Sequence, residues 1–188
     1  MYYHASQIAN IKVLEPRISN HNTPLVYFST KRENVLVYLS NAIEKYCNET
    51  GFEYNGNWKK WGPYGFEQDG TLRLEEYYPN AIEDTYKGVS GYIYNVKTIY
   101  NIQDNIQISN AVTTIESVIV DGCEYIEDAY TEIINAASKG LIKVLKYEDL
   151  SDKRRDWIEE TMNREFEEAA EHPEYRHFLK GKFEFLEK

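Results

Sequence analysis

Short strand-like segments and longer helix-like segments alternate along this chain, and their order restricts the fold more than any other property of the sequence. Residues 2–6 and 24–29 are rich in β-forming side chains and predict two early strands. Further strands are expected over residues 71–74, 91–96, 113–120 and 141–145. Turns are indicated by three dipeptides, which are Asn55-Gly56, Asp69-Gly70 and Asp121-Gly122.

Apolar residues at helical spacing predict one long helix over 33–47. Thr30 and Glu33 form a capping-box pattern at its start, and Gly51 is the expected stop. Other helices are expected over residues 79–86, 127–138 and 152–170, with Pro173 and a charged tail after the last. This order predicts an α+β fold with mostly antiparallel sheets and flanking helices. We expect one domain over 1–150 and a C-terminal helical extension over 151–188.

The charge balance narrows the classes of partner. The chain has 21 Lys and Arg against 31 Asp and Glu, which gives a net charge of −10. A broad basic field for duplex nucleic acid or an anionic membrane is therefore not expected, although a local basic groove is compatible with this balance. No apolar run reaches the ~20 residues of a membrane span, and the start lacks the features of a signal peptide. A cytoplasmic protein is the expectation.

Few side chains suggest chemistry by themselves. Cys47 and Cys123 match no metal-binding spacing, and we expect buried, inert thiols and no metal site. His172 and His177 lie in the charged tail, where solvated surface is the expectation. His21 is either a turn residue or part of a ligand groove. The 17 tyrosines either line a polar groove or fill a small core.

Four short patterns, taken together, resemble a known family. They are Tyr3-His4-Ala5-Ser6 with the later Leu14-Glu15-Pro16, then Val26-Tyr27-Phe28-Ser29-Thr30 running into a helix, then residues 91–96, and finally Glu116 within the 113–120 segment. In this order they are similar to the ADP-ribosyltransferase fold, in its His-Tyr-Glu branch of diphtheria toxin, poly-ADP-ribose polymerases and DarT-like enzymes. The resemblance covers about residues 1–148.

The resemblance implies an NAD-dependent mono-ADP-ribosyltransferase with an unknown acceptor, which is a protein, a nucleic acid or a small molecule. In this reading His4 holds a ribose hydroxyl, Tyr27 stacks on the nicotinamide, and Glu116 opposes the positive charge that grows at the ribose C1′. Ala5, Ser6, Tyr92 and Tyr94 would line the NAD site. By themselves, His4 and Tyr27 are more typical of structural residues than of functional ones. Glu124 and Glu127 are alternative carboxylates.

Two other functions stay open. Ala5 stands where a glycine is common in the family, and this departure fits a catalytically inactive ligand-binding or protein-interaction domain on the same fold. The segment Trp58-Lys59-Lys60-Trp61 has three interpretations, which are a loop whose tryptophans fill the core, a surface for single-stranded nucleic acid, and a substrate-facing loop over the NAD site. The amphipathic helix over 152–170 is expected to brace the fold, with partner binding as the alternative.

Overall fold

The chain forms two compact units. The computed structural model describes residues 1–18, 23–103, 108 and 110–187. Unit 1 consists of residues 1–39, 64–73 and 87–143, and unit 2 of residues 40–63, 74–86 and 144–188. Helices combined with antiparallel sheets confirm the expected α+β class. The expected division at residue 150 describes neither unit, because residues 40–63 and 74–86 belong with the C-terminal helices.

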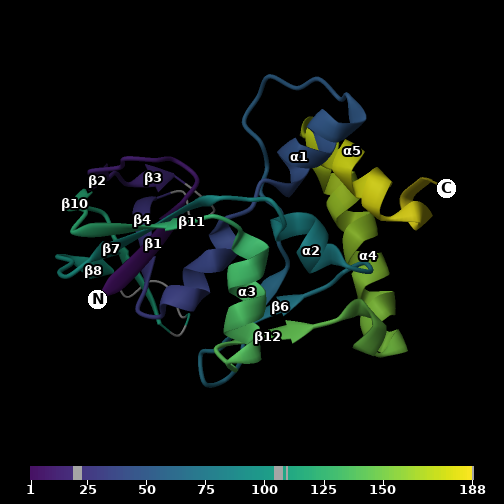
Figure 1. Ribbon diagram of the computed structural model, residues 1–188. Helices are drawn as coiled ribbons and strands as arrows, with labels where there is room; N and C mark the ends of the chain where they lie inside the picture. The colour runs from purple at the N-terminus through teal and green to yellow at the C-terminus, as the bar shows by residue number, and fades with distance from the viewer. Residues whose placement is uncertain (19–22, 104–107, 109, 188) are drawn as a thin grey trace. The chain divides into compact units, whose positions relative to one another are not determined.

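Unit 1 is built on a seven-stranded sheet with the order β11-β7-β1-β4-β9-β8, and β3 pairs with β4 beside this path (Figure 1). Its strands are β1 (Tyr2–Ser6), β3 (Arg17–Ile18), β4 (Pro24–Ser29), β7 (Gly91–Val96), β8 (Ile102–Gln103), β9 (Ala111–Thr114) and β11 (Gly122–Ile126). β1 is central. It pairs with β7 along its whole length, whereas its register with β4 places Tyr3 opposite Ser29.

The two faces of this sheet are covered by different elements. On one face a small sheet of β2 (Val13–Leu14) and β10 (Val118–Ile119) contributes to an apolar cluster of Leu14, Val26, Phe28, Tyr94, Val96, Ile99 and Val118. A 3-10 helix, η1 (Arg32–Tyr38), packs on β1, β4 and β7, and α3 (Ala129–Ser138) packs on η1. A Cβ at Gly91 would lie 2.6 Å from Leu39 Cδ2, so this glycine allows the end of η1 to approach β7.

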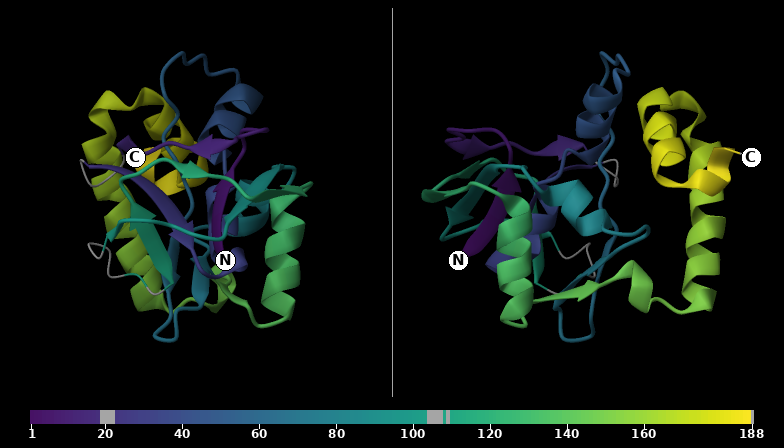
Figure 2. Two further views of the ribbon diagram at one scale, coloured as in Figure 1. Left: turned by 90° about the vertical axis from the view of Figure 1, so that its left-hand side faces the viewer. Right: turned by 45° about the vertical axis from the view of Figure 1, so that its right-hand side comes forward.

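Unit 2 consists mainly of helices around one apolar cluster. The helices are α1 (Ala42–Thr50), α2 (Ala81–Tyr86), α4 (Asp152–Glu168) and α5 (Pro173–Lys182), with short 3-10 turns η2 (Tyr147–Asp149), η3 (Ala169–Glu171) and η4 (Glu184–Glu187). Figure 2 shows α5 beside the C-terminal part of α4. Phe178 is fully buried in the cluster, and its ring centroid lies 5.1 Å from that of Trp61.

A further sheet of three strands has the order β12-β6-β5. These strands are β5 (Tyr64–Phe66), β6 (Leu72–Glu75) and β12 (Ile142–Leu145). The turn before β6 has Gly70 at φ 77°, and its amide donates to the Glu67 carbonyl at 2.9 Å, as the Asp69-Gly70 pattern predicts. The chain passes from one unit to the other within β6 and within β12.

The prediction of one long helix over 33–47 is wrong. The segment forms η1 and then α1, with Leu39 in a non-helical conformation between them. Lys31, rather than Thr30, precedes η1 and makes no side-chain cap. Val35 is buried in unit 1 and Ile43 in unit 2, so one continuous apolar pattern serves two separate cores. Periodicity reports that a face is buried but not which core buries it.

Two other predictions need correction. The strand expected over 113–120 is two strands, β9 and β10, with a bend at residues 115–116, and the following strand β11 was not expected. The charged tail after Pro173 is the helix α5, in which Pro173 occupies the first turn and Phe178 and Leu179 are buried. Proline is favoured at that position because the first helical N–H groups have no intrahelical partner.

Candidate functional site

His4 joins the two strands that carry the first two patterns of the resemblance. Its Nδ1 lies 2.8 Å from the carbonyl oxygen of Tyr27, on the neighbouring strand β4. Burial lowers the pKa of His4 below its ordinary value, and the hydrogen bond to Tyr27 opposes this with a smaller effect. The imidazole is therefore neutral at pH 7. Since a carbonyl only accepts, Nδ1 carries the proton and Nε2 presents a lone pair.

The side chains of His4 and Tyr27 leave the sheet on opposite faces. Tyr3 lies opposite Ser29, so His4 is level with Phe28, and the rings of His4 and Phe28 make an edge contact at 6.0 Å. Side chains alternate along a strand, which directs Tyr27 to the other face. That face is the one on which η1 packs. The structure thus brings the backbones at these two positions together but separates their rings.

Of the other residues expected around NAD, Ser6, Tyr92 and Tyr94 share the face of His4, and Ala5 lies on the opposite face with Tyr27. Tyr94 is buried, which raises the pKa of its phenol. The Tyr94 hydroxyl donates to the Ile8 carbonyl at 2.7 Å and accepts from the Ile11 amide at 3.2 Å. The Tyr94 hydroxyl therefore binds the segment that follows β1 both as a donor and as an acceptor.

Tyr92 is the more accessible of this pair. Its ring centroid lies 5.3 Å from that of Tyr125, which is 58% exposed on β11. On η1, by comparison, Tyr38 is 45% exposed and its ring makes an edge contact with Tyr64 at 6.1 Å. These exposed tyrosine pairs offer flat, amphipathic surfaces. Tyr125 and Tyr38 were not singled out from sequence, because seventeen tyrosines give no signal of which are exposed.

Glu116 does not lie beside His4. It is exposed, in the bend after β9, where Asn101 Nδ2 donates to its carboxylate. His4 is level with Phe28 and Val112, and Val112 is two strands, or about 10 Å, from His4. Glu116 follows beyond the end of β9, further along than Val112. Glu116 is therefore an outward carboxylate paired with Asn101 in a bend, and it is not part of a continuous strand over 113–120.

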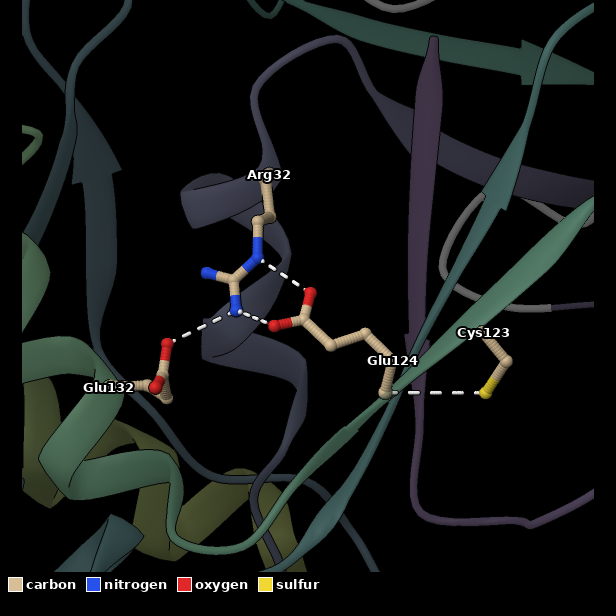
Figure 3. A network of polar contacts seen from close by, with 4 residues as sticks. All are labelled: Arg32, Cys123, Glu124 and Glu132. Atoms are coloured by element: carbon tan, nitrogen blue, oxygen red, sulfur yellow. Dashed lines mark hydrogen bonds and ion pairs between the residues drawn. The ribbon is translucent and has the colours of Figure 1, made fainter.

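A second polar cluster surrounds Arg32 (Figure 3). Its guanidinium donates to both carboxylate oxygens of Glu124 on β11, at 2.9 and 2.7 Å, and to Glu132 on α3 at 3.1 Å. The hydrogen bond from Arg32 holds the pKa of Glu124 below its usual value, and that of Arg32 is raised. These residues fasten η1 to β11 and α3. Glu127, the other alternative carboxylate, is exposed in the bend after β11.

Two further histidines, His172 and His177, and the two cysteines lie apart from His4 in the sequence. His172 Nδ1 is 3.5 Å from the buried carboxylate of Glu174, and His177 contacts Thr50 at 2.8 Å. Among the residues that the structure describes, no three His, Cys, Asp or Glu side chains gather as a metal site. Cys47 is buried as expected, whereas Cys123 is exposed, which corrects that expectation. His21 lies outside the described residues.

The segment from Trp58 to Trp61 belongs to the core of unit 2. Trp61 is only 7% exposed and lies in the apolar cluster, and Trp58 packs against its edge. Lys60 Nζ donates to the Ser40 carbonyl at 3.3 Å, and Lys59 Nζ lies 4.8 Å from the centroid of the Tyr175 ring. The core reading of this segment is confirmed, and its lysines are engaged within unit 2.

The described residues line hollows on the surface of each unit. One, of about 520 Å³, is in unit 1 and includes Glu67, Asp69 and Lys143 in its lining, with Lys143 paired to Glu67 at 3.4 Å. The other, of about 290 Å³, is in unit 2 between α4 and α5. Neither is lined by His4, Tyr27 or Glu116.

Comparison of the chain with protein-family models, with curated proteins and with solved structures finds no match. Within the described residues, every helix is too short or too polar to cross a membrane. The function is therefore argued from the site itself.

Proposed function

We propose that unit 1 binds NAD⁺ at the junction of β1 and β4 and transfers its ADP-ribosyl group. The observation that carries the proposal is the hydrogen bond from His4 Nδ1 to the Tyr27 carbonyl, which joins the two strands at their pattern residues. It fixes the tautomer, so that Nε2 is an acceptor for a ribose hydroxyl. The resemblance of residues 1–148 to ADP-ribosyltransferases supplies the ligand and the chemistry.

The reaction breaks the bond between the ribose C1′ and the nicotinamide nitrogen. Nicotinamide leaves as a neutral molecule, and positive charge develops on the sugar. A carboxylate near C1′ lowers this barrier, and groups of this kind are worth about 3–4 kcal/mol, or roughly 10²–10³ in rate. Glu116 is assigned this role by the resemblance. To act, its carboxylate must leave Asn101 and approach the ribose when NAD⁺ binds.

A second function is favoured by the position of Glu116. An exposed carboxylate beyond the end of β9, bonded to Asn101, supports a domain that binds NAD⁺ without turning it over. The presence of Ala5 in place of the family's glycine supports the same alternative. In this case His4 would still hold the ribose, and the domain would act through a partner protein.

Nicotinamide release from NAD⁺ separates the two functions. For a transferase, we expect the wild type to release nicotinamide and Glu116→Gln to be slower by about 10²–10³. Glu160→Gln is the matched control, since it removes an equal charge from an exposed position on α4, in unit 2. Release that survives Glu116→Gln would refute the role of this carboxylate.

Absence of release calls for a measurement of binding. A ligand that binds only the folded state raises the unfolding free energy, by about 2.7 kcal/mol at a hundredfold excess over its dissociation constant. If NAD⁺ stabilises the wild type but not His4→Ala, without release, the binding function stands alone. Both functions are refuted if the protein releases no nicotinamide from NAD⁺ and if NAD⁺ stabilises the wild type and His4→Ala to the same extent or not at all.

A further inference from the structure

A groove between α4 and α5 concentrates positive charge on an acidic chain. We call it the α4–α5 groove, and its lining includes Phe52, Phe166, Pro173, Arg176, His177 and Lys180. Its volume is about 290 Å³, close to the lower end of the range for small-ligand sites. All of its lining belongs to unit 2, so the groove shares no residue with the β1–β4 junction.

The basic groups in the groove have no acidic partner. Among the described residues, neither Arg176 nor Lys180 forms an ion pair, whereas Lys182 on the same helix pairs with Asp84 at 2.7 Å. Arg176 and Lys180 are four residues apart on α5 and therefore lie on one face of that helix. In a chain with a net charge of −10, two adjacent cations without a carboxylate form a local site of positive potential that attracts an anion.

Aromatic rings hold the flat side chains of the groove in place. The guanidinium carbon of Arg176 lies 4.1 Å from the centroid of Phe166, and the imidazole of His177 is stacked on Phe52 at 4.4 Å with an interplanar angle of 18°. A guanidinium held over a ring keeps its N–H groups at the edge, where they can bind an anion. The planar side chains of Arg176 and His177 are groups against which a flat base can stack, and the His177 ring also lies 5.3 Å from the Tyr46 ring at an interplanar angle of 41°.

The hydrogen bonds of His177 define what it offers to a ligand. Thr50 Oγ1 donates its single proton to the Tyr46 carbonyl at 2.8 Å. The Cys47 carbonyl is a second acceptor for this proton, at 3.3 Å. With the Thr50 proton on either carbonyl, the imidazole donates the 2.8 Å contact between His177 Nε2 and Thr50 Oγ1. In the neutral ring, Nδ1 is then an acceptor for a hydroxyl or an amino group. A simple inorganic anion has no use for such an acceptor or for a stacking plane.

We propose that the α4–α5 groove binds a nucleoside phosphate. The phosphate contacts Arg176 and Lys180, the base stacks on the planar side chains, and a ligand hydroxyl or amino group donates to His177 Nδ1. A free mononucleotide and a nucleotide within a single strand present the same chemistry. This inference is independent of the proposed function, because it concerns residues of unit 2 alone.

Calorimetric titration of the full chain with AMP tests the proposal. We expect AMP to bind, and adenosine and inorganic phosphate each to bind about tenfold or more weakly, since each lacks one half of the contacts. The variant Arg176→Gln with Lys180→Gln should also lose about tenfold or more. The matched control is Lys153→Gln with Arg164→Gln, which removes two exposed charges from α4 outside the groove and should stay within about twofold.

Three results would overturn the proposal. They are no AMP binding at millimolar concentrations, equal AMP affinity in the groove variant and in its control, or AMP binding that is lost in His4→Ala and kept in the groove variant. A short single-stranded oligonucleotide distinguishes the two sources of ligand. Binding about tenfold tighter than AMP, and lost in the groove variant, would identify a strand, and weaker binding a free nucleotide.

Discussion

Replacing Phe178 by alanine tests whether α5 is an integral part of unit 2 or the solvated tail that its charges suggest. Phe178 has no exposed surface, and its ring centroid lies 5.1 Å from that of Trp61 and 5.8 Å from that of Tyr46. Truncating a buried phenylalanine costs about 3–5 kcal/mol, which combines lost transfer free energy with the cavity left behind. For a chain of this length, that corresponds to a fall in Tm of roughly 6–20 °C.

Tryptophan fluorescence during urea unfolding is the assay, because Trp58, Trp61 and Trp157 are the only tryptophans and all lie in unit 2. The signal therefore follows unit 2 even where unit 1 unfolds separately. Glu167→Ala is the control, since Glu167 is exposed on α4 in the same unit and its loss should change the free energy of unfolding by less than about 0.5 kcal/mol. A loss below about 1 kcal/mol for Phe178→Ala would refute the packing of α5 into this core.

Other predictions concern the polar groups. Arg32→Met should lower the unfolding free energy by about 1 kcal/mol at neutral pH. Arg32 lowers the pKa of Glu124 in the folded state, so this stability difference between wild type and Arg32→Met is present at a pH above the ordinary pKa of a carboxyl group. It disappears as the pH falls through the folded pKa of Glu124. A stability difference that persists in strong acid would contradict the ion pair as its cause. Cys123 should react with a thiol reagent in the native protein. Cys47 should react only on unfolding, because burial shields its thiol and raises the pKa of that thiol. Mass analysis of the labelled peptides shows which cysteine has reacted. Glu116→Gln should change the unfolding free energy by less than about 0.5 kcal/mol, and a larger loss in urea unfolding would mean that Glu116 has a structural role.

The strands at residues 2–6, 24–29 and 91–96 were predicted correctly because β-forming side chains in a short, bounded run favour a strand wherever it pairs. The prediction of one strand over 113–120 failed for a local reason. Thr114 Oγ1 accepts a hydrogen bond from the Glu116 amide at 3.1 Å, and such side-chain bonds compete with ladder hydrogen bonds. Ile119 is 76% exposed, so an apolar run here did not mean burial.

The candidate site was harder to predict because it depends on pairing between distant segments. The contact of His4 with Tyr27 needs β1 beside β4, and the bond of Arg32 to Glu124 joins residues 92 positions apart. Neither follows from spacing within a segment. The basic groove was missed for another reason, since net charge averages over the whole chain, while Arg176 and Lys180 act over the Debye length of about 10 Å.

The two proposals predict different uses of the same molecule. NAD⁺ contains an adenosine phosphate, so both the α4–α5 groove and the β1–β4 junction should bind it. A rise in Tm with NAD⁺ therefore cannot assign a site by itself, because binding to either unit stabilises the folded chain. Nicotinamide release reports only the chemistry proposed for unit 1. Stabilisation by NAD⁺ that survives His4→Ala but is lost when Arg176 and Lys180 are both replaced by Gln belongs to the groove. Stabilisation by NAD⁺, measured in His4→Ala and in the groove variant, thus distinguishes a site that cleaves NAD⁺ from a site that only binds its nucleotide part.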